Sequence, residues 1–230
     1  MDYLALVNRT RVECGVSGAS TPLTSVSGLT GESARIASWV NSAWVDIQTT
    51  KEDWQWLRQA VQFNTVAQQQ VYTPAQAGVA STFGNWKRDS FRCSSVGQNY
   101  ADEQLMNYME YTTFRNLYQY GTMRTNYMRP VVVSIAPGSD KSLAFGATPD
   151  QPYVITGEYY TKPVEFAANT DTPSLPDRFH MIIVYRAMMS YAGYNAASEV
   201  YQRGELEFKR LMNRLNIDQL PTIVSGPPLA

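Results

Sequence analysis

The sequence predicts an α+β fold in which N- and C-terminal helices form a helical bundle and an antiparallel β-domain is inserted between them. Apolar residues recur at helical spacing in both terminal sections, whereas the middle section is rich in β-branched and aromatic residues between Pro and Gly. The 230 residues are enough to bury a real core. We divide the chain into N-terminal helices (1–58), a β-rich domain (59–170) with a helical insertion near 102–120, C-terminal helices (171–215) and an extended tail (216–230).

The N-terminal section is expected to contain two helices. Asp2 is placed to cap a short helix that stops near Gly15. A loop rich in Gly, Ser and Thr follows over 15–31, and Thr30 or Ser33 is placed to cap the second helix. Apolar residues of the second helix recur at helical steps, which predicts one buried face made of Ile36, Trp39, Val40, Ala43, Trp44 and Ile47.

The middle section is expected to form short strands around one helix. Residues 61–63 and 71–73 flank a polar stretch in a hairpin-like arrangement. Other β-branched and aromatic runs between turns predict strands at 91–96, 130–135, 143–145 and 153–160. Residues 102–120 are expected to be helical, with one face formed by Leu105, Met109, Phe114 and Leu117.

The C-terminal section predicts a long helical segment from about Pro176 to Leu215. Ser174 is a candidate cap, and Asp177 favours the helix start. An unbroken helix of roughly 40 residues would be roughly 60 Å long, so we expect a break near Gly193 or Gly204. The apolar stripe advances by three or four residues at each step through Ile182, Tyr185, Met189, Gly193, Ala196, Val200, Gly204, Phe208, Leu211 and Leu215.

The tail, residues 216–230, carries one charged residue, Asp218. Its prolines disfavour a helix, so an extended apolar segment is expected. Two interpretations stay open: the tail packs on its own domain, or it docks on a partner as an added strand or a groove-filling segment. The candidate docking residues are Ile217, Leu220, Ile223, Val224 and Leu229.

Composition restricts the classes of function. Charged residues make up 17% of the chain, below the roughly 25% of typical domains. The 15 Tyr, 5 Trp and 9 Met are types favoured where proteins meet, although an aromatic-rich core accounts for part of them. The net charge of −1 argues against sequence-specific binding of duplex DNA. Two cysteines without a secretory signal predict a cytoplasmic product, and no segment approaches the roughly 18 apolar residues of a membrane span.

The residues that carry chemistry do not form a recognisable catalytic set. His180 lies at the start of an apolar helical stripe, and one His without a Cys or His neighbour cannot build a zinc site. Cys14 and Cys93 are expected to be small buried hydrophobes. The adjacent carboxylates at 52–53 and 102–103 point in different directions, and no phosphate-binding loop, nucleophile elbow or calcium loop occurs. We therefore expect a protein that is not an enzyme and that holds no metal or cofactor.

One stretch combines basic and aromatic residues. Arg115, Arg124 and Arg129 alternate with tyrosines that include Tyr127. Such a combination stacks single-stranded nucleic acid in some proteins. Three arginines are few for that purpose, and an interface loop or an ordinary amphipathic surface is the favoured interpretation.

Several short motifs occur in order along the chain: ECGVSG at 13–18, TGE at 30–32, WVNSAWVDIQ at 39–48, WQWL at 54–57 and LPDRFH at 175–180. A β-region ending in YVITGEYY at 153–160 precedes the last of them. This pattern resembles the head-to-tail connecting or adaptor proteins of tailed bacteriophages. The resemblance covers residues 1 to about 215 and consists of an ordered pattern rather than a single motif.

The resemblance implies a structural virion protein of the neck, assembled in the bacterial host cytoplasm and without catalytic residues. Such adaptors form rings, commonly of twelve copies, beneath the portal protein, extend the DNA channel and offer a platform for tail or nozzle proteins. DNA passes through the lumen without sequence-specific binding. For this chain the resemblance implies that the tail residues dock on the portal, and ring or tail contacts are assigned to Arg115, Arg124, Tyr127 and Arg129.

Two alternatives remain open from the sequence. Another neck or tail component, such as a tail-completion protein, would bind the tail tube rather than the portal. A glycan-binding or glycan-degrading module is suggested by the Trp and Tyr content, and it would need exposed aromatics in a row or a cleft with converging carboxylates.

Overall fold

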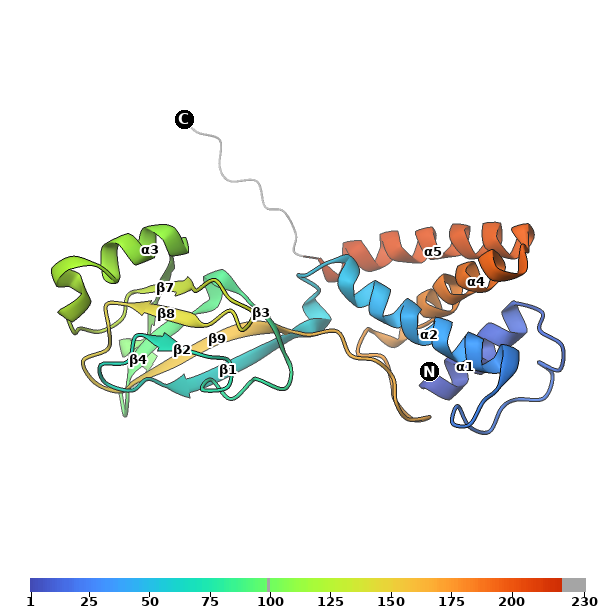
Figure 1. Cartoon of the computed structure of the whole chain (residues 1–230), viewed down its shortest axis with the longest axis horizontal. Coiled ribbons are helices and arrows are strands. Elements are labelled where there is room, and N and C mark those ends of the chain that lie inside the picture. The colour runs from blue at the N-terminus through green and yellow to red at the C-terminus, as the bar shows by residue number, and fades with distance from the viewer. Residues whose placement is uncertain (99, 221–230) are drawn as a thin grey trace, which may run out of the picture. The chain divides into compact units, whose positions relative to one another are not determined.

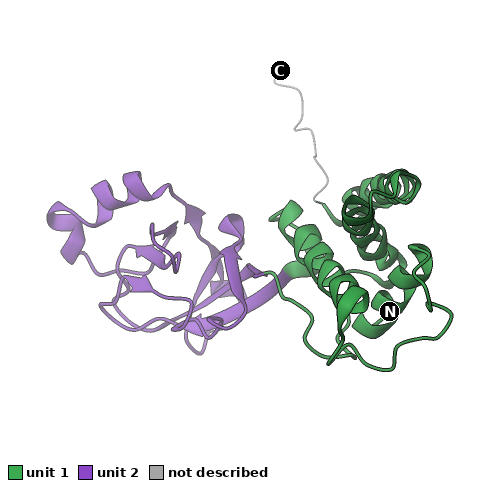
Figure 2. Ribbon diagram, turned by 45° about the vertical axis from the view of Figure 1, so that its right-hand side comes forward, with its two compact units in different colours: residues 1–57, 163–230 green, residues 58–162 purple. Residues whose placement is uncertain are grey.

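The computed structural model describes residues 1–98 and 100–220. They form two compact units, which Figure 2 distinguishes by colour. The helical unit comprises Met1–Leu57 and the described residues from Pro163 onward, and the β unit comprises Arg58–Lys162. Helices at both ends of the chain and strands between them confirm the predicted α+β class.

Four α-helices build the helical unit: α1 (Tyr3–Glu13), α2 (Gly31–Thr50), α4 (Met181–Asn195) and α5 (Ser198–Gln219), with the 3-10 turns η1 (Gln55–Leu57) and η5 (Asp177–Phe179). The carboxylate of Asp2 caps α1, because its Oδ1 accepts a hydrogen bond from the Ala5 backbone N–H at 2.8 Å. Thr30 occupies the N-cap position of α2 without a capping hydrogen bond from its side chain. Helix α4 is the centre of the unit, since it packs against α1, α2 and α5.

The long C-terminal segment breaks between α4 and α5, as Figure 1 shows. The break falls at Ala196, which adopts a left-handed conformation with φ of 52°, three residues after Gly193. Gly204 lies inside α5, so no break occurs there. A Cβ atom on Gly204 would lie 3.1 Å from the Tyr185 carbonyl oxygen of α4. This glycine therefore allows α5 to pack closely on α4.

The expectation of an extended chain from residue 216 is wrong for residues 216–219, because α5 continues to Gln219. A proline restricts the residue before it to extended backbone and lacks the N–H of a helical hydrogen bond. Leu220, which precedes Pro221, has a ψ angle of 152° and ends the helix. The prolines therefore prevent helix formation only from residue 220 onward.

Two sheets and one helix build the β unit (Figure 1). In the first sheet β9 (Tyr153–Thr161) pairs with β1 (Arg58–Asn64), β3 (Phe83–Trp86) and β4 (Arg92–Ser95), and β5 (Gln104–Leu105) extends the edge beyond β4. The second sheet has the order β2 (Val71–Tyr72), β8 (Leu143–Gly146), β7 (Val132–Ile135) and β6 (Asn107–Tyr108). All pairs are antiparallel except β6 with β7.

The expected hairpin of β1 and β2 is wrong, because the two strands belong to different sheets. β1 pairs with β9 from Arg58↔Tyr160 to Asn64↔Val154, and β2 pairs with β8. The segment between β1 and β2 passes from one sheet to the other. It is held by the Tyr72 hydroxyl, which accepts a hydrogen bond from the Val66 N–H at 2.8 Å. The long β9 offers a partner to each of the seven residues of β1, whereas β2 is only two residues long.

The core of the β unit joins both sheets. Side chains of β9 alternate between buried and partly buried, as expected for a strand with one face on a core. Gly157 lies where the Phe91 ring crosses β9, and a Cβ atom there would be 2.6 Å from Phe91 Cδ1. Only glycine admits the ring at this position. The largest buried side chains of this core are Phe63, Tyr72, Trp86, Phe91, Phe145, Tyr153, Ile155 and Tyr159.

The helix expected over 102–120 is shorter, since α3 spans Tyr111–Tyr118 and is followed by the 3-10 turn η4 (Gly121–Thr125). Glu110 defines the start of α3, because its side chain accepts hydrogen bonds from the N–H groups of Thr112 and Thr113. The residues before it contribute β5 and β6 to the sheets. Leu105, expected on the apolar face of the helix, is exposed on β5.

Candidate interaction surfaces

Exposed apolar side chains gather along one segment of the β unit. Five large apolar residues of the segment each expose between 41% and 58% of their surface: Leu117, Tyr120, Met123, Tyr127 and Met128. Together with the exposed Arg115 and Arg124 they define what we call the α3–η4 surface. Tyr, Met and Arg are enriched in the buried parts of protein interfaces. This composition is typical of a surface that binds another protein.

The other face of α3 fixes the segment to the second sheet. Phe114 is fully buried and packs with Val132 and Ala144. The Tyr118 ring stacks on the Phe114 ring at a centroid distance of 5.2 Å, and it lies against Gly146, where a Cβ atom would be 2.9 Å away. The exposed residues are therefore carried by an anchored helix and its following turn.

The two exposed arginines of this surface lack an acidic partner. No Asp or Glu occurs from residue 111 to residue 139, and within the described residues neither Arg115 nor Arg124 forms an ion pair. The Arg115 guanidinium carbon lies 5.9 Å from the centroid of the Tyr120 ring. The surface is therefore both apolar and positively charged.

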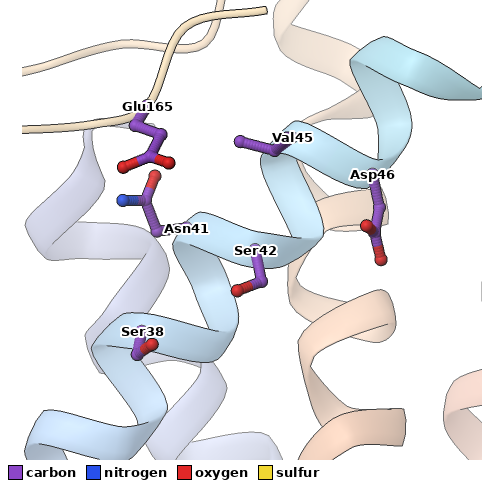
Figure 3. Close-up of a pocket in the computed structure, with 6 residues that line it drawn as sticks. All are labelled: Ser38, Asn41, Ser42, Val45, Asp46 and Glu165. Atoms are coloured by element: carbon purple, nitrogen blue, oxygen red, sulfur yellow. The ribbon is translucent and has the colours of Figure 1, made fainter.

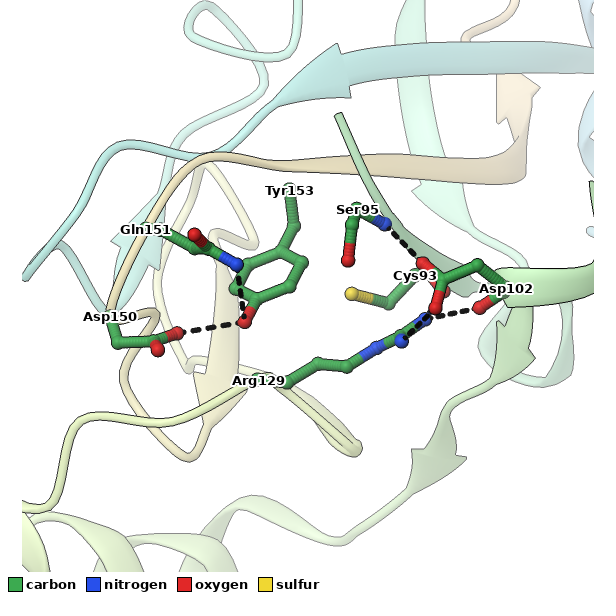
Figure 4. A network of polar contacts seen from close by, with 7 residues as sticks. All are labelled: Cys93, Ser95, Asp102, Arg129, Asp150, Gln151 and Tyr153. Carbon is green, nitrogen blue, oxygen red and sulfur yellow. Dashed lines mark hydrogen bonds and ion pairs between the residues drawn. The ribbon is translucent and has the colours of Figure 1, made fainter. Parts of the chain in front are cut away.

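Arg129 lies elsewhere, in the polar network of Figure 4. Its guanidinium forms an ion pair with Asp102 at 2.7 Å and donates a hydrogen bond to the Cys93 carbonyl oxygen at 2.6 Å. Asp102 also accepts a hydrogen bond from the Ser95 N–H at 2.6 Å. The Ser95 N–H and then Arg129 lower the pKa of Asp102. Arg129 therefore ties its loop to β4, so the structure separates it from Arg115, Arg124 and Tyr127.

The C-terminal end of α5 presents a second surface. A hollow of about 530 Å³ is lined by Arg178, Phe179, Leu211, Arg214, Ile217 and Asp218. Ile217 exposes 85% of its surface beside this hollow, and Leu220 is partly buried. The other predicted docking residues, Ile223, Val224 and Leu229, lie outside the described residues. An isoleucine this exposed is suited to contact another protein.

A polar hollow lies along α2 (Figure 3). Its volume is about 300 Å³, and it is lined by Ser38, Asn41, Ser42, Val45, Asp46 and Glu165. Asn41 is already occupied, since it exchanges hydrogen bonds with the backbone of Phe166. Asp46 forms an ion pair with Arg186 at 2.8 Å. Glu165 forms no ion pair among the described residues, so it leaves the hollow negatively charged. Sequence reasoning missed this hollow because Glu165 is far from α2 in the chain.

His180 and the cysteines have structural surroundings. His180 is buried at the start of α4, with Nδ1 2.6 Å from the Met1 amino nitrogen and Nε2 3.1 Å from the Leu175 carbonyl oxygen. Burial lowers the pKa of His180. Cys14 and Cys93 are buried free thiols, as predicted, and burial raises the pKa of Cys14 to about 12.

The described residues, 1–98 and 100–220, contain neither a cluster of metal-ligating side chains nor a helix suited to span a membrane. No group of three His, Cys, Asp or Glu side chains there is placed to hold a metal ion. No helix there combines the length and the apolar composition needed to cross a bilayer.

Exposed apolar surfaces on a two-unit fold are characteristic of a protein that assembles with other proteins. A family model described as SU10 adaptor protein matches residues 1–226. The chain belongs to this family of phage head-to-tail adaptors, a structural class rather than a class of enzymes. The resemblance found in the motifs is thus confirmed, and it identifies a component of the phage neck. A search of curated proteins finds no match to the chain.

Proposed function

We propose that this protein is the subunit of a head-to-tail adaptor ring that binds the portal protein and extends the DNA channel toward the tail. The ring, of twelve copies, assembles in the host cytoplasm and carries the tail or nozzle proteins on its other side. DNA crosses its lumen without sequence-specific contacts, in keeping with the net charge of −1.

The C-terminal end of α5 supports the proposal of portal binding. Ile217 is exposed beside the hollow between Phe179 and Leu211, and the chain then continues into a segment with one charge between residues 216 and 230. An apolar, proline-rich segment binds well in a groove of a partner, because proline reduces the conformational entropy lost on binding. We therefore assign portal docking to Ile217, Leu220 and the apolar residues that follow.

Truncation tests this assignment. A chain that ends at Leu220 keeps the whole of α5 and should stay folded, as measured by circular dichroism and thermal unfolding. We expect it not to sediment with heads that contain the portal but lack the adaptor. Undiminished sedimentation with the heads would refute portal docking by this segment.

A pair of matched variants separates apolar contact from chain stiffness. Ile223→Ser, Val224→Ser and Leu229→Ser together should abolish attachment, whereas Pro221→Ala, Pro227→Ala and Pro228→Ala together should only weaken it. Attachment to isolated tails instead of to portal-containing heads would favour a tail-completion protein.

A further inference from the structure

We propose that the α3–η4 surface of one copy docks on the α2 hollow of a second copy, with Arg124 facing Glu165. This inference rests on the proposed ring and names the contact that closes it. A ring requires a heterologous interface, in which two different surfaces of the same chain meet. The α3–η4 surface and the α2 hollow belong to different units, so they satisfy this requirement.

Charge complementarity selects a second copy as the partner. The β unit contains nine basic and seven acidic residues, so its net charge is +2. The rest of the chain contains ten basic and thirteen acidic residues, so the helical unit has a net charge of −3. Opposite charges steer two surfaces together and fix their register. Two copies therefore attract each other when the β unit of one meets the helical unit of the next.

The local charges agree with the charges of the units. Arg124 is exposed on η4, and no acidic residue occurs between residues 111 and 139. Glu165 is exposed at the rim of the α2 hollow. Arg186 already compensates Asp46, which leaves Glu165 as the carboxylate available to a guanidinium. Arginine and carboxylate form two parallel hydrogen bonds when they meet, so this pair also gives orientation.

The hollow also suits the uncharged part of the α3–η4 surface. Ser38 and Ser42 are one turn apart on α2 and line the hollow beside Val45. Hydroxyl groups accept hydrogen bonds from the Tyr127 hydroxyl or from an arginine, while Val45 gives an apolar contact for Met123 or Met128. Docking would cover side chains that each expose at least 41% of their surface in the single copy. Removal of this apolar area from water adds to the attraction between the charges.

A charge exchange tests the proposal in solution. Arg124→Glu should weaken self-association at least about tenfold, and so should Glu165→Arg, because each places like charges at the interface. The protein with both substitutions should regain most of the wild-type association. Arg88→Glu makes the same change of charge in the β unit outside the α3–η4 surface and should have little effect. The dissociation constants come from sedimentation equilibrium. Failure of the double substitution to restore association would overturn the Arg124–Glu165 pair.

Photo-crosslinking identifies the partner directly. A photoreactive phenylalanine derivative replaces Tyr127 in a mixture of isotopically heavy and light chains, both free and bound to portal-containing heads. We expect mass spectra with crosslinks between heavy and light chains that join Tyr127 to the peptide containing Ser38–Asp46 or Glu165. Crosslinks confined to one chain, crosslinks to portal or tail proteins, or no crosslink in either state would each overturn the proposal.

Failure of this inference differs from failure of the proposed function. The chain that ends at Leu220 should keep self-association and lose attachment to heads. The Arg124→Glu variant should lose self-association although its portal-binding segment is intact. If truncation leaves attachment to heads unchanged while the charge exchange behaves as expected, the contact between copies is supported and portal docking by the C-terminal segment is refuted.

Discussion

The charged residues of the helical unit and those of the α3–η4 segment have different surroundings. In the helical unit, ion pairs link one element to another: Arg203 with Glu13 joins α5 to α1, Arg186 with Asp46 joins α4 to α2, and Arg178 with Asp218 joins η5 to α5. In the α3–η4 segment, Arg115 and Arg124 lie among exposed apolar side chains and form no ion pair within the described residues. The first arrangement pairs the charges within the subunit, whereas the second leaves charge available to a partner.

Within a single stretch of sequence, residues available for binding differ from structural ones in whether their charge is already paired inside the subunit. Arg124 and Arg129 are close in sequence and identical in type. Arg129 is engaged by Asp102 and by the Cys93 carbonyl group, whereas Arg124 is exposed. Substitutions in this stretch should therefore divide into those that reduce stability and those that reduce assembly.

The largest expected effect is on the anchor of α3. Phe114→Ala removes a fully buried ring between Val132 and Ala144, and such a truncation destabilises a protein by about 3 kcal/mol or more. Leu117→Ala, three residues along the same helix, should change the free energy of unfolding by less than about 0.5 kcal/mol because Leu117 is exposed. Urea unfolding measures both. Equal effects would contradict the division of α3 into a buried and an exposed face.

Arg129→Ala should have the next largest effect. It removes the ion pair with Asp102 and leaves the Cys93 carbonyl group without its guanidinium donor. We expect thermal unfolding several degrees lower than in the wild type, and a smaller effect than that of Phe114→Ala. Arg129→Lys should restore little of the lost thermal stability, because an ammonium group cannot reproduce the planar fork of the guanidinium. Full rescue by lysine would show that charge alone matters at this site.

The same network should make stability depend on pH. The pKa of Asp102 in the folded state is below its ordinary value of 3.8, because the Ser95 N–H and Arg129 favour the carboxylate. Stabilisation from Asp102 is therefore fully present above the ordinary value and is lost as the pH falls through the folded value. The difference in unfolding free energy between wild type and Asp102→Asn should be constant at neutral pH and shrink in strongly acidic solution. A difference that grows with acidification would contradict this sign.

Much of the helical unit could be predicted from sequence because its signals are local. The Asp2 cap and the apolar spacing of α2 depend on residues within a few turns of one another. The break expected near Gly193 falls three residues later, at Ala196, which adopts a left-handed conformation that is usual for glycine and rare for alanine. The end of α5 was placed too early because the effect of Pro221 reaches only its neighbours.

The β unit was harder to predict because its contacts join residues distant in sequence. β1 pairs with β9 across most of the unit, and nothing in either strand specifies that partner over β2. The same holds for the candidate surfaces. The sequence identified Arg115, Arg124, Tyr127 and Arg129 as one group, but the partner of Arg129 lies 27 residues away at Asp102. Arg129 is partly buried whereas Arg115 and Arg124 are exposed. This difference in burial arises only when the unit folds, so the sequence does not predict it.

The smallest expected effect on stability is that of Arg124→Ala. Arg124→Ala removes an exposed side chain without an ion pair among the described residues, so the free energy of unfolding should change by less than about 0.5 kcal/mol. Self-association should nevertheless weaken, by less than for Arg124→Glu, because alanine removes attraction without adding repulsion. Urea unfolding and sedimentation equilibrium on the same sample measure the two quantities. An Arg124→Ala protein that loses stability and association together would place this arginine with Arg129, as part of the subunit rather than of its interface.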